Sequence, residues 1–80
     1  MYYVYLLRSE SHPKQLYVGS TRDLRQRLKD HNEGRCPYTA KFRPWILVAY
    51  FAFAQEKGAI AFEKYLKSGS GRAFSNRHFL

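Results

Sequence analysis

The chain has 80 residues and a formal charge of +8 at pH 7, from 14 lysines and arginines against six aspartates and glutamates. That length permits a single domain, residues 1–80, because so short a chain buries only about 60% of the surface it exposes when unfolded. The charge excess favours polyanions, above all nucleic acid, as partners. A basic structural or ribosome-associated protein would show the same excess, so charge alone leaves both classes open.

Several other classes of protein are disfavoured by the composition. The single cysteine, Cys36, cannot form a disulfide within the chain, and the three histidines are not spaced as zinc ligands. No apolar run approaches the roughly 18 residues of a membrane span, and the first residues lack a basic leader with a cleavage site. We therefore expect a cytoplasmic protein that makes no membrane contact.

The first elements in chain order are two strands. Residues 2–7 (YYVYLL) are aromatic and β-branched, and the short apolar run QLYVGS resumes at residue 15. Between them lies SESHPK, whose Pro13 would remove a donor from a paired strand and therefore belongs in a loop. Residues 2–19 are predicted to form an antiparallel hairpin.

A helix is predicted to follow the hairpin. Ser20 or Thr21 offers an N-cap, and Asp23 would lie in the first turn, where the helix dipole favours negative charge. Gly34 would end the helix as a C-cap glycine.

One face of this predicted helix is mixed in character. Leu24, Arg27, Leu28 and His31 fall within an arc of about 100° on the helical wheel. A helix that faced only a core would continue its leucines at the arginine and histidine positions. We therefore expect this face to be half core and half active site.

The remaining elements complete a β-β-α-β-α(α) order. Residues 34–44 are predicted to be a basic surface loop with two prolines. Residues 45–53 (WILVAYFAF) are nearly all apolar and are predicted to be the central or most buried strand. Residues 54–68 are predicted to be a helix that stops at Gly69, and a short helix is expected from Ala73 to Phe79. The fold class is α/β (α+β), a small mixed sheet with helices packed on it.

Glu63 is the second unusual position. It falls on the same helical arc as Ala59, Phe62 and Leu66, and a carboxylate inside an apolar face needs a cation or several hydrogen-bond donors. One interpretation is a specific functional partner. The other is an ion pair with Lys67, four residues further on, with Glu63 at the edge of the face. The sequence leaves both open.

At this point the residues resemble a known family. The chain has YVY (Tyr3 to Tyr5), YVG (Tyr17 to Gly19), then Arg27, His31 and Glu63 at the spacing of GIY-YIG nucleases. The segment EKYLKSGSGRAFSNR, residues 63–77, is also similar to that of the small stand-alone bacterial members described as excinuclease-like domain proteins. One departure is Tyr3, which replaces the first glycine of the family name and affects only the local backbone.

The resemblance implies a fold, a reaction and a cofactor. The implied fold is a three-stranded antiparallel sheet flanked by helices. The implied reaction is metal-dependent hydrolysis of DNA phosphodiester bonds, in repair or recombination, on DNA that can be branched or single-stranded. One Mg²⁺ or Mn²⁺ ion is implied, with Glu63 as its only direct protein ligand and with water and phosphate oxygens completing the coordination.

The resemblance also implies roles for the other residues. Arg27 would bind the phosphate as charge develops. Tyr17 would act as general base or position the attacking water, and Tyr5 would hydrogen-bond the water or the phosphate. His31 could accept the proton from Tyr17. Asn76 would organise the site or contact the DNA backbone. Gly19, which has no side chain to block the tyrosine beside it, would allow close approach of the protein backbone or of the DNA.

Two rival functions remain open at this level. The first is a nucleic-acid-binding module of the same fold whose cleavage is negligible. The second is the basic structural or ribosome-associated protein, in which the tyrosines would be ordinary core residues. Whether the protein has a protein partner or forms a dimer is not specified by the sequence.

Overall fold

The computed structural model describes residues 1–80, and its centre is a three-stranded antiparallel sheet in the order β2-β1-β3. Strand β1 (Tyr2–Ser9) pairs on one side with β2 (Leu16–Thr21) and on the other with β3 (Trp45–Phe53). The predicted hairpin, with Pro13 in its loop, is therefore confirmed. Tyr3 lies in regular pairing opposite Thr21, so the missing family glycine leaves the strand intact.

The predicted central strand is wrong. Residues 45–53 form the edge strand β3, and β1 is central, with four consecutive fully buried residues from Val4 to Leu7. The apolar run in β3 suggested burial on both faces, but Ile46 and Tyr50 are exposed. Burial here follows the position of a strand in the sheet more than its own composition.

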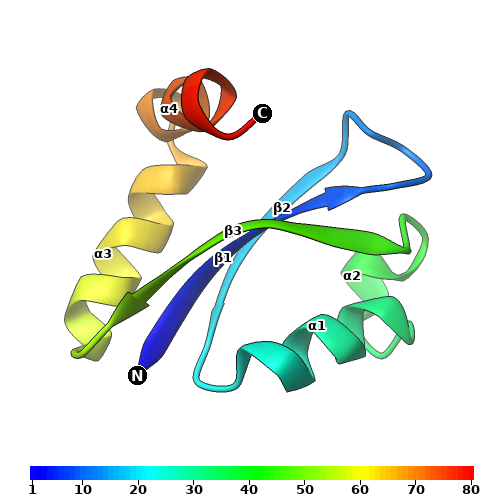
Figure 1. Ribbon diagram of the computed structural model, residues 1–80, viewed down its shortest axis with the longest axis horizontal. Helices are drawn as coiled ribbons and strands as arrows, with labels where there is room; N and C mark the ends of the chain where they lie inside the picture. Colours follow the sequence, from blue (N-terminus) through cyan, green and yellow to red (C-terminus); the bar gives the residue numbers. More distant parts are fainter.

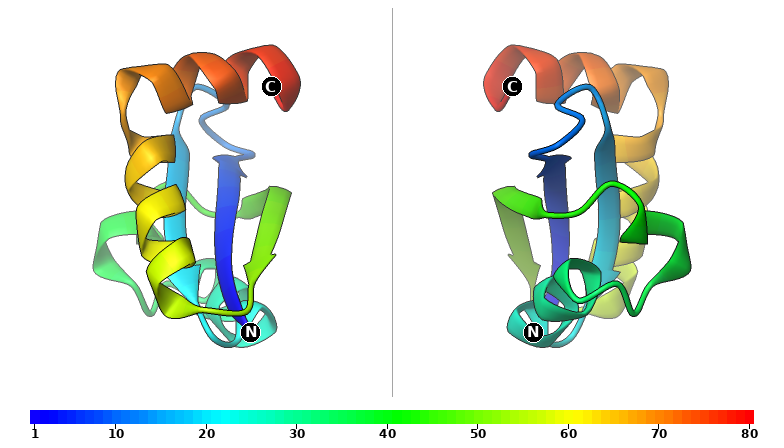
Figure 2. Two further views of the ribbon diagram at one scale, coloured as in Figure 1. Left: turned by 90° about the vertical axis from the view of Figure 1, so that its left-hand side faces the viewer. Right: turned by 90° about the vertical axis from the view of Figure 1, so that its right-hand side faces the viewer.

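The helices cover both faces of the sheet (Figure 1). Helix α1 (Leu24–Asn32) and the short α2 (Pro37–Ala40) lie on one face, and α3 (Glu56–Lys67) lies on the other. Helix α4 (Gly69–His78) crosses the end of α3, as the two side views in Figure 2 show. None of these helices has the length and apolar character that a bilayer span requires.

Two small cores form because alternate residues of β1 point to opposite faces. Val4 packs with Ala59 and Leu66 of α3, together with phenylalanines of β3, α3 and α4. Tyr5 and Leu7 pack on the other face with Trp45, Leu24, Leu28, Tyr17, Phe42 and Leu47. The leucines of α1 thus anchor it to the sheet, as its predicted mixed face requires.

Three local predictions need correction. Helix α1 is capped by Asp23, whose carboxylate accepts from the Gln26 backbone N–H at 3.1 Å, and not by Ser20 or Thr21. The predicted loop 34–44 contains α2. Helix α4 begins at Gly69 rather than Ala73, because Ser68 caps it and accepts from the Gly71 backbone N–H.

The C-terminal end of α1 is confirmed. The helix has Glu33 as its C-cap, and Gly34 follows with φ +77°. This left-handed conformation is accessible to glycine at little cost, which explains the residue at this position.

Candidate active site

A buried chain of hydrogen bonds joins β1, α1 and α2. The Tyr5 hydroxyl lies 2.8 Å from Nε2 of His31, and Nδ1 of His31 lies 2.7 Å from the Thr39 hydroxyl. All three side chains are at most 2% exposed. The Thr39 hydroxyl donates in turn to the Cys36 carbonyl at 3.3 Å.

The direction of this chain follows from its last bond. Because the Thr39 hydrogen is given to a carbonyl, Thr39 must accept from Nδ1–H of His31. Nε2 is then unprotonated and accepts from the Tyr5 hydroxyl. Burial, followed by the nearby Arg27, lowers the pKa of His31, and burial, followed by Tyr17, raises the pKa of Tyr5 well above 10. Both groups are therefore neutral at pH 7.

Tyr17 lies at the exposed edge of the sheet, on β2. Its ring centroid is 4.9 Å from that of His31 and 6.2 Å from that of Tyr5. Partial burial and the nearby Cys36 raise the pKa of the Tyr17 phenol, against the opposing charges of Lys67 and Arg27. Its hydroxyl makes no hydrogen bond within the chain, so it is free to meet a ligand.

Gly19 makes room for the two tyrosines. It is buried and lies directly opposite Tyr5 in the pairing of β1 and β2. A Cβ atom at Gly19 would lie 2.5 Å from the Tyr5 hydroxyl oxygen and 2.9 Å from Cε2 of Tyr17. The position therefore excludes any side chain while both phenols keep their places.

Substitution Gly19→Ala is expected to destabilise the protein by about 1–3 kcal/mol, the usual cost of overpacking. The added methyl must displace the Tyr5 phenol, which is held by His31. Urea unfolding measures the change. Gly69→Ala is the matched control, because a Cβ there meets no atom within 4 Å. Equal stabilities for the two variants would contradict the prediction.

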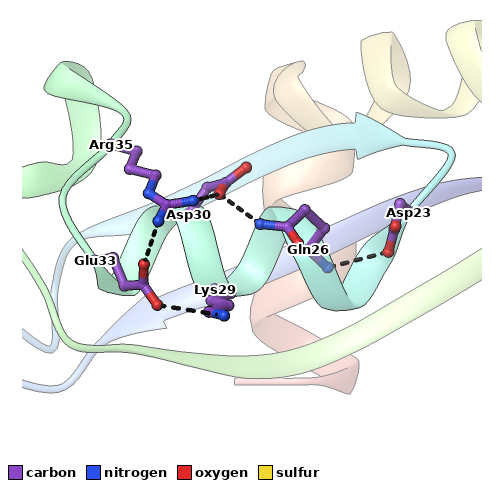
Figure 3. Close-up of polar contacts among 6 residues, drawn as sticks. All are labelled: Asp23, Gln26, Lys29, Asp30, Glu33 and Arg35. Atoms are coloured by element: carbon purple, nitrogen blue, oxygen red, sulfur yellow. Dashed lines mark hydrogen bonds and ion pairs between the residues drawn. The ribbon is translucent and has the colours of Figure 1, made fainter.

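The Arg27 guanidinium has no ion pair, because the nearby acidic residues of α1 pair with other cations. Figure 3 shows that Asp30 and Glu33 are paired with Arg35 and Lys29 along the outer surface of this helix, at 2.9–3.9 Å. The Arg27 side chain has no ion pair or hydrogen bond within the chain. Its charge nevertheless acts on His31, Tyr5 and Tyr17, lowering the pKa of each. An unpaired guanidinium beside two phenols suits an anionic ligand.

Glu63 reaches the same sheet edge from α3, on the opposite face. Partial burial raises the pKa of its carboxyl, but hydrogen bonds from Lys67 and Ser20 outweigh burial and lower it overall. Lys67 Nζ lies 2.7 Å from Glu63 Oε2, so the ion-pair alternative left open by the sequence is observed. The negative charge of Glu63 also acts on Tyr5 and Tyr17, raising the pKa of both.

The donor chemistry at Glu63 fits a divalent cation such as Mg²⁺. Mg²⁺ keeps several waters and is usually held by one or two carboxylates together with substrate phosphates. The chain has no cluster of three or more His, Cys, Asp or Glu side chains, so a site built wholly from protein ligands is not provided. Lys67 would have to leave Glu63 when the cation binds, because the two positive charges repel.

A groove of about 710 Å³ runs along the β2 edge beside Tyr17. It extends from Tyr38 on α2 to α4, and its charged lining is entirely cationic, namely Lys14, Lys67 and Arg72. Asn76 lines its far end. A hollow with this lining fits a phosphate backbone.

Comparison with known proteins decides the family. Residues 1–77 match the family model described as the GIY-YIG catalytic domain. The chain belongs to the GIY-YIG family.

Individual relatives agree with this assignment. The chain is 40% identical over 67 residues to structure-specific endonuclease subunit SLX1 of Malassezia globosa, which covers 79% of this chain. It is 36% identical over 84 residues to the SLX1 subunit of Candida dubliniensis, which covers 96% of this chain. These matches span only 15% and 28% of the relatives' own lengths.

A solved structure supports the GIY-YIG fold. The solution structure of a UPF0213 protein from Bacillus halodurans aligns with a TM-score of 0.57 and 33% identity. The alignment covers 96% of this chain and 82% of the other. The predicted GIY-YIG architecture, a three-stranded antiparallel sheet between helices, is confirmed.

The structure brings most of the predicted GIY-YIG site residues to one edge of the sheet. Tyr5, Tyr17, Gly19 and His31 lie together on the α1 face, and the exposed Arg27 of α1 is near enough for its charge to act on both phenols and on His31. Glu63 comes close enough from the other face to influence both phenols, and Asn76 lies further along the groove. One detail differs: His31 bonds Tyr5 and Thr39 through its two nitrogens, so it makes no hydrogen bond with the Tyr17 hydroxyl, although the two rings are neighbours.

Other residues of the site were not found in the sequence. Thr39 was hidden in a segment expected to be a basic loop, and no periodicity marks it as buried. Lys67 and Arg72 were visible as charges, but their place in the groove depends on the sharp turn between α3 and α4.

Stability is expected to fall as the pH is lowered from 7 to 5, because of His31. The folded pKa of His31 is depressed, so the unfolded state binds more protons below about pH 6.5, and stability declines by up to about 1.4 kcal/mol per pH unit. The decline ends once the pH falls below the folded pKa. Chemical denaturation at several pH values measures the slope.

Two variants test this assignment. His31→Gln should flatten the slope, whereas His12→Gln, at an exposed histidine, should retain it. A slope that survives His31→Gln unchanged would assign the pH dependence to another group.

Proposed function

We propose that this GIY-YIG domain hydrolyses phosphodiester bonds in DNA with the help of one divalent cation, Mg²⁺ or Mn²⁺. The observation that supports the proposal is a free phenol, Tyr17, at a cationic groove, with an unpaired guanidinium and a carboxylate near enough for their charges to act on it. This set contains a group for the attacking water, one for the phosphate charge and one for a metal. Relatives named as subunits of structure-specific endonucleases favour branched DNA as substrate, and repair or recombination as the setting.

In this mechanism Tyr17 activates or positions the attacking water. Its hydroxyl is the reactive phenol because the Tyr5 hydroxyl is buried and committed to His31. Since Tyr5 donates its hydrogen to His31, its oxygen presents only lone pairs, and it can hold a water by accepting from it. His31 keeps Tyr5 in this orientation, and Thr39 keeps His31 in the required tautomer.

The phosphate charge is met by Arg27 and by the cation. The planar guanidinium of Arg27 can donate two hydrogen bonds to phosphate oxygens and is not engaged elsewhere. Glu63 would hold the cation, which when bound supplies charge stabilisation at the phosphate. Asn76, Lys67 and Arg72 would contact the DNA backbone along the groove, and Gly19 would keep the approach to the phenols open.

A nicking assay tests the proposal. The protein is incubated with flapped, branched, single-stranded and duplex DNA in Mg²⁺, in Mn²⁺ and in excess EDTA. We expect cleavage with either cation and none in EDTA. Cleavage that persists in EDTA would contradict metal dependence.

A non-cleaving nucleic-acid-binding module is the second candidate, and the basic groove favours it independently of any catalytic group. DNA binding that weakens with salt, without cleavage on any substrate, would support this alternative. The structural or ribosome-associated role predicts that neither Tyr17→Phe nor Arg27→Ala affects function.

A further inference from the structure

A second hollow of about 280 Å³ opens beside Tyr17, on the side of α2. Four of its nine lining residues are aromatic, namely Tyr17, Tyr38, Phe42 and Trp45. Gln15, Leu16, Tyr17 and Tyr38 line both this hollow and the large groove, so the two spaces meet at the reactive phenol.

Tyr38 is the unusual member of this set. Its side chain is 78% exposed, the highest value among the exposed large hydrophobic residues, and its ring centroid lies 6.1 Å from that of Tyr17. An aromatic ring so exposed contributes little to the core, yet the backbone of α2 on either side of it is held in place. Pro37 begins α2, and the Thr39 carbonyl accepts from Nε1 of Trp45 at 3.0 Å.

The polar groups around the hollow are those that a nucleotide needs. Lys41 lines it, and Lys14 lines the adjoining groove. The Gln15 side chain is exposed, makes no hydrogen bond within the chain, and offers both a donor and an acceptor. Aromatic walls beside a cationic groove are the combination that binds single-stranded nucleic acid, by stacking and by phosphate contacts.

We propose that this hollow receives the base of an unpaired nucleotide next to the phosphate held at Tyr17, with Tyr38 stacking on that base. The inference rests on the proposed function and adds a substrate feature to it. A paired base is stacked on both sides and would have to leave the helix, at a cost of a few kcal/mol. The preferred DNA therefore has a single-stranded nucleotide at this position, as in a flap or a loop.

An abasic scan in EDTA tests the pocket by binding alone. A single abasic site is moved stepwise through a flapped DNA and through a single-stranded DNA, and the dissociation constant is measured at each position. The parent protein, which has Tyr38, should lose affinity by a factor of about 5 to 150 at one position, the range typical of one base–aromatic stack. On intact DNA, Tyr38→Ala should bind more weakly than the parent protein by the same factor. An abasic site at the sensitive position should not weaken the binding of this variant further.

Matched variants complete the test. Tyr38→Phe should keep the position-dependent loss, because the ring remains. Tyr50→Ala removes another exposed tyrosine, which lies on β3 and is 54% exposed. Its dissociation constants should equal those of the parent protein at every abasic position. Since Tyr38 is so exposed, thermal unfolding of Tyr38→Ala should resemble that of the parent.

The possible results separate the two proposals. Metal-dependent cleavage by the parent, with no position sensitive to an abasic site, would overturn the base pocket and leave the nuclease function standing. A loss for Tyr38→Ala that is equal at every abasic position would also overturn the pocket. Absence of both binding and cleavage by the parent would overturn both proposals together.

Discussion

Replacing Glu63 with glutamine is expected to lower metal-dependent DNA cleavage by a factor of about one thousand or more, because a catalytic cation contributes several kcal/mol at the transition state. Glutamine keeps the shape of the side chain but removes the negative charge that attracts the cation. The fold should be little affected. The pair with Lys67 lies near the surface, and such pairs contribute at most about 1 kcal/mol.

The control for this variant lies on the same helix. Glu56→Gln makes the same chemical change in the first turn of α3, at an exposed position, and should leave cleavage unchanged. Mn²⁺ titration gives a readout that does not depend on activity. Paramagnetic broadening of the Ser20 and Lys67 amide signals should be seen in the parent and lost in Glu63→Gln. Equal cleavage by Glu63→Gln and the parent would remove the proposed role of this carboxylate.

The second large effect is expected from Tyr17→Phe, which should reduce cleavage by a factor of about 10² to 10⁴, the usual contribution of a positioned proton acceptor. The ring remains and continues to pack against His31 and Trp45, so only the hydroxyl is lost. Tyr50→Phe makes the same change at an exposed position on β3 and should have no effect.

The pH dependence of the parent gives a second test of Tyr17. Because burial raises its pKa above 10, less than about 0.1% of the phenol is ionised at pH 7. If the phenolate accepts the proton, the rate should rise about tenfold per pH unit from pH 7 to 9. Tyr17→Phe should lack this rise. The same rise in the variant would assign it to another group, such as a metal-bound water.

The elements that the sequence predicted correctly have local causes. Strand-forming residues and Pro13 defined the hairpin, Gly34 defined the end of α1, and helical spacing placed Leu24, Leu28 and His31 on one face. Each of these features depends on the residue itself or on neighbours within a few positions. The resemblance to the GIY-YIG family then supplied the relation between distant residues, which periodicity cannot supply.

The errors at β3, at Thr39 and at the start of α1 depend on contacts between distant segments, whereas the early start of α4 has a local cause, its Ser68 cap. Strand pairing decides that β1 is the central strand and β3 an edge strand. The composition of β3 gave no sign that it lies at an edge. Thr39 is buried because α2 packs against His31 and Trp45. Thr21, one of the two predicted caps, stays paired in β2, so α1 begins later than predicted and Asp23, expected in the first turn, becomes its N-cap.

The separation of the two cores by a single sheet bears on how this small domain can diversify. The Tyr5–His31–Thr39 chain depends on side chains of one face, whereas Lys67, Arg72 and Asn76 belong to helices held by the other. If the groove binds DNA as proposed, replacing or remodelling α4 is expected to change the shape of nucleic acid that it accepts, while the Tyr5–His31–Thr39 hydrogen bonds keep their geometry. Under the proposed function, exchange of α4 alone would therefore alter substrate preference without rebuilding the Tyr5–His31–Thr39 side of the sheet.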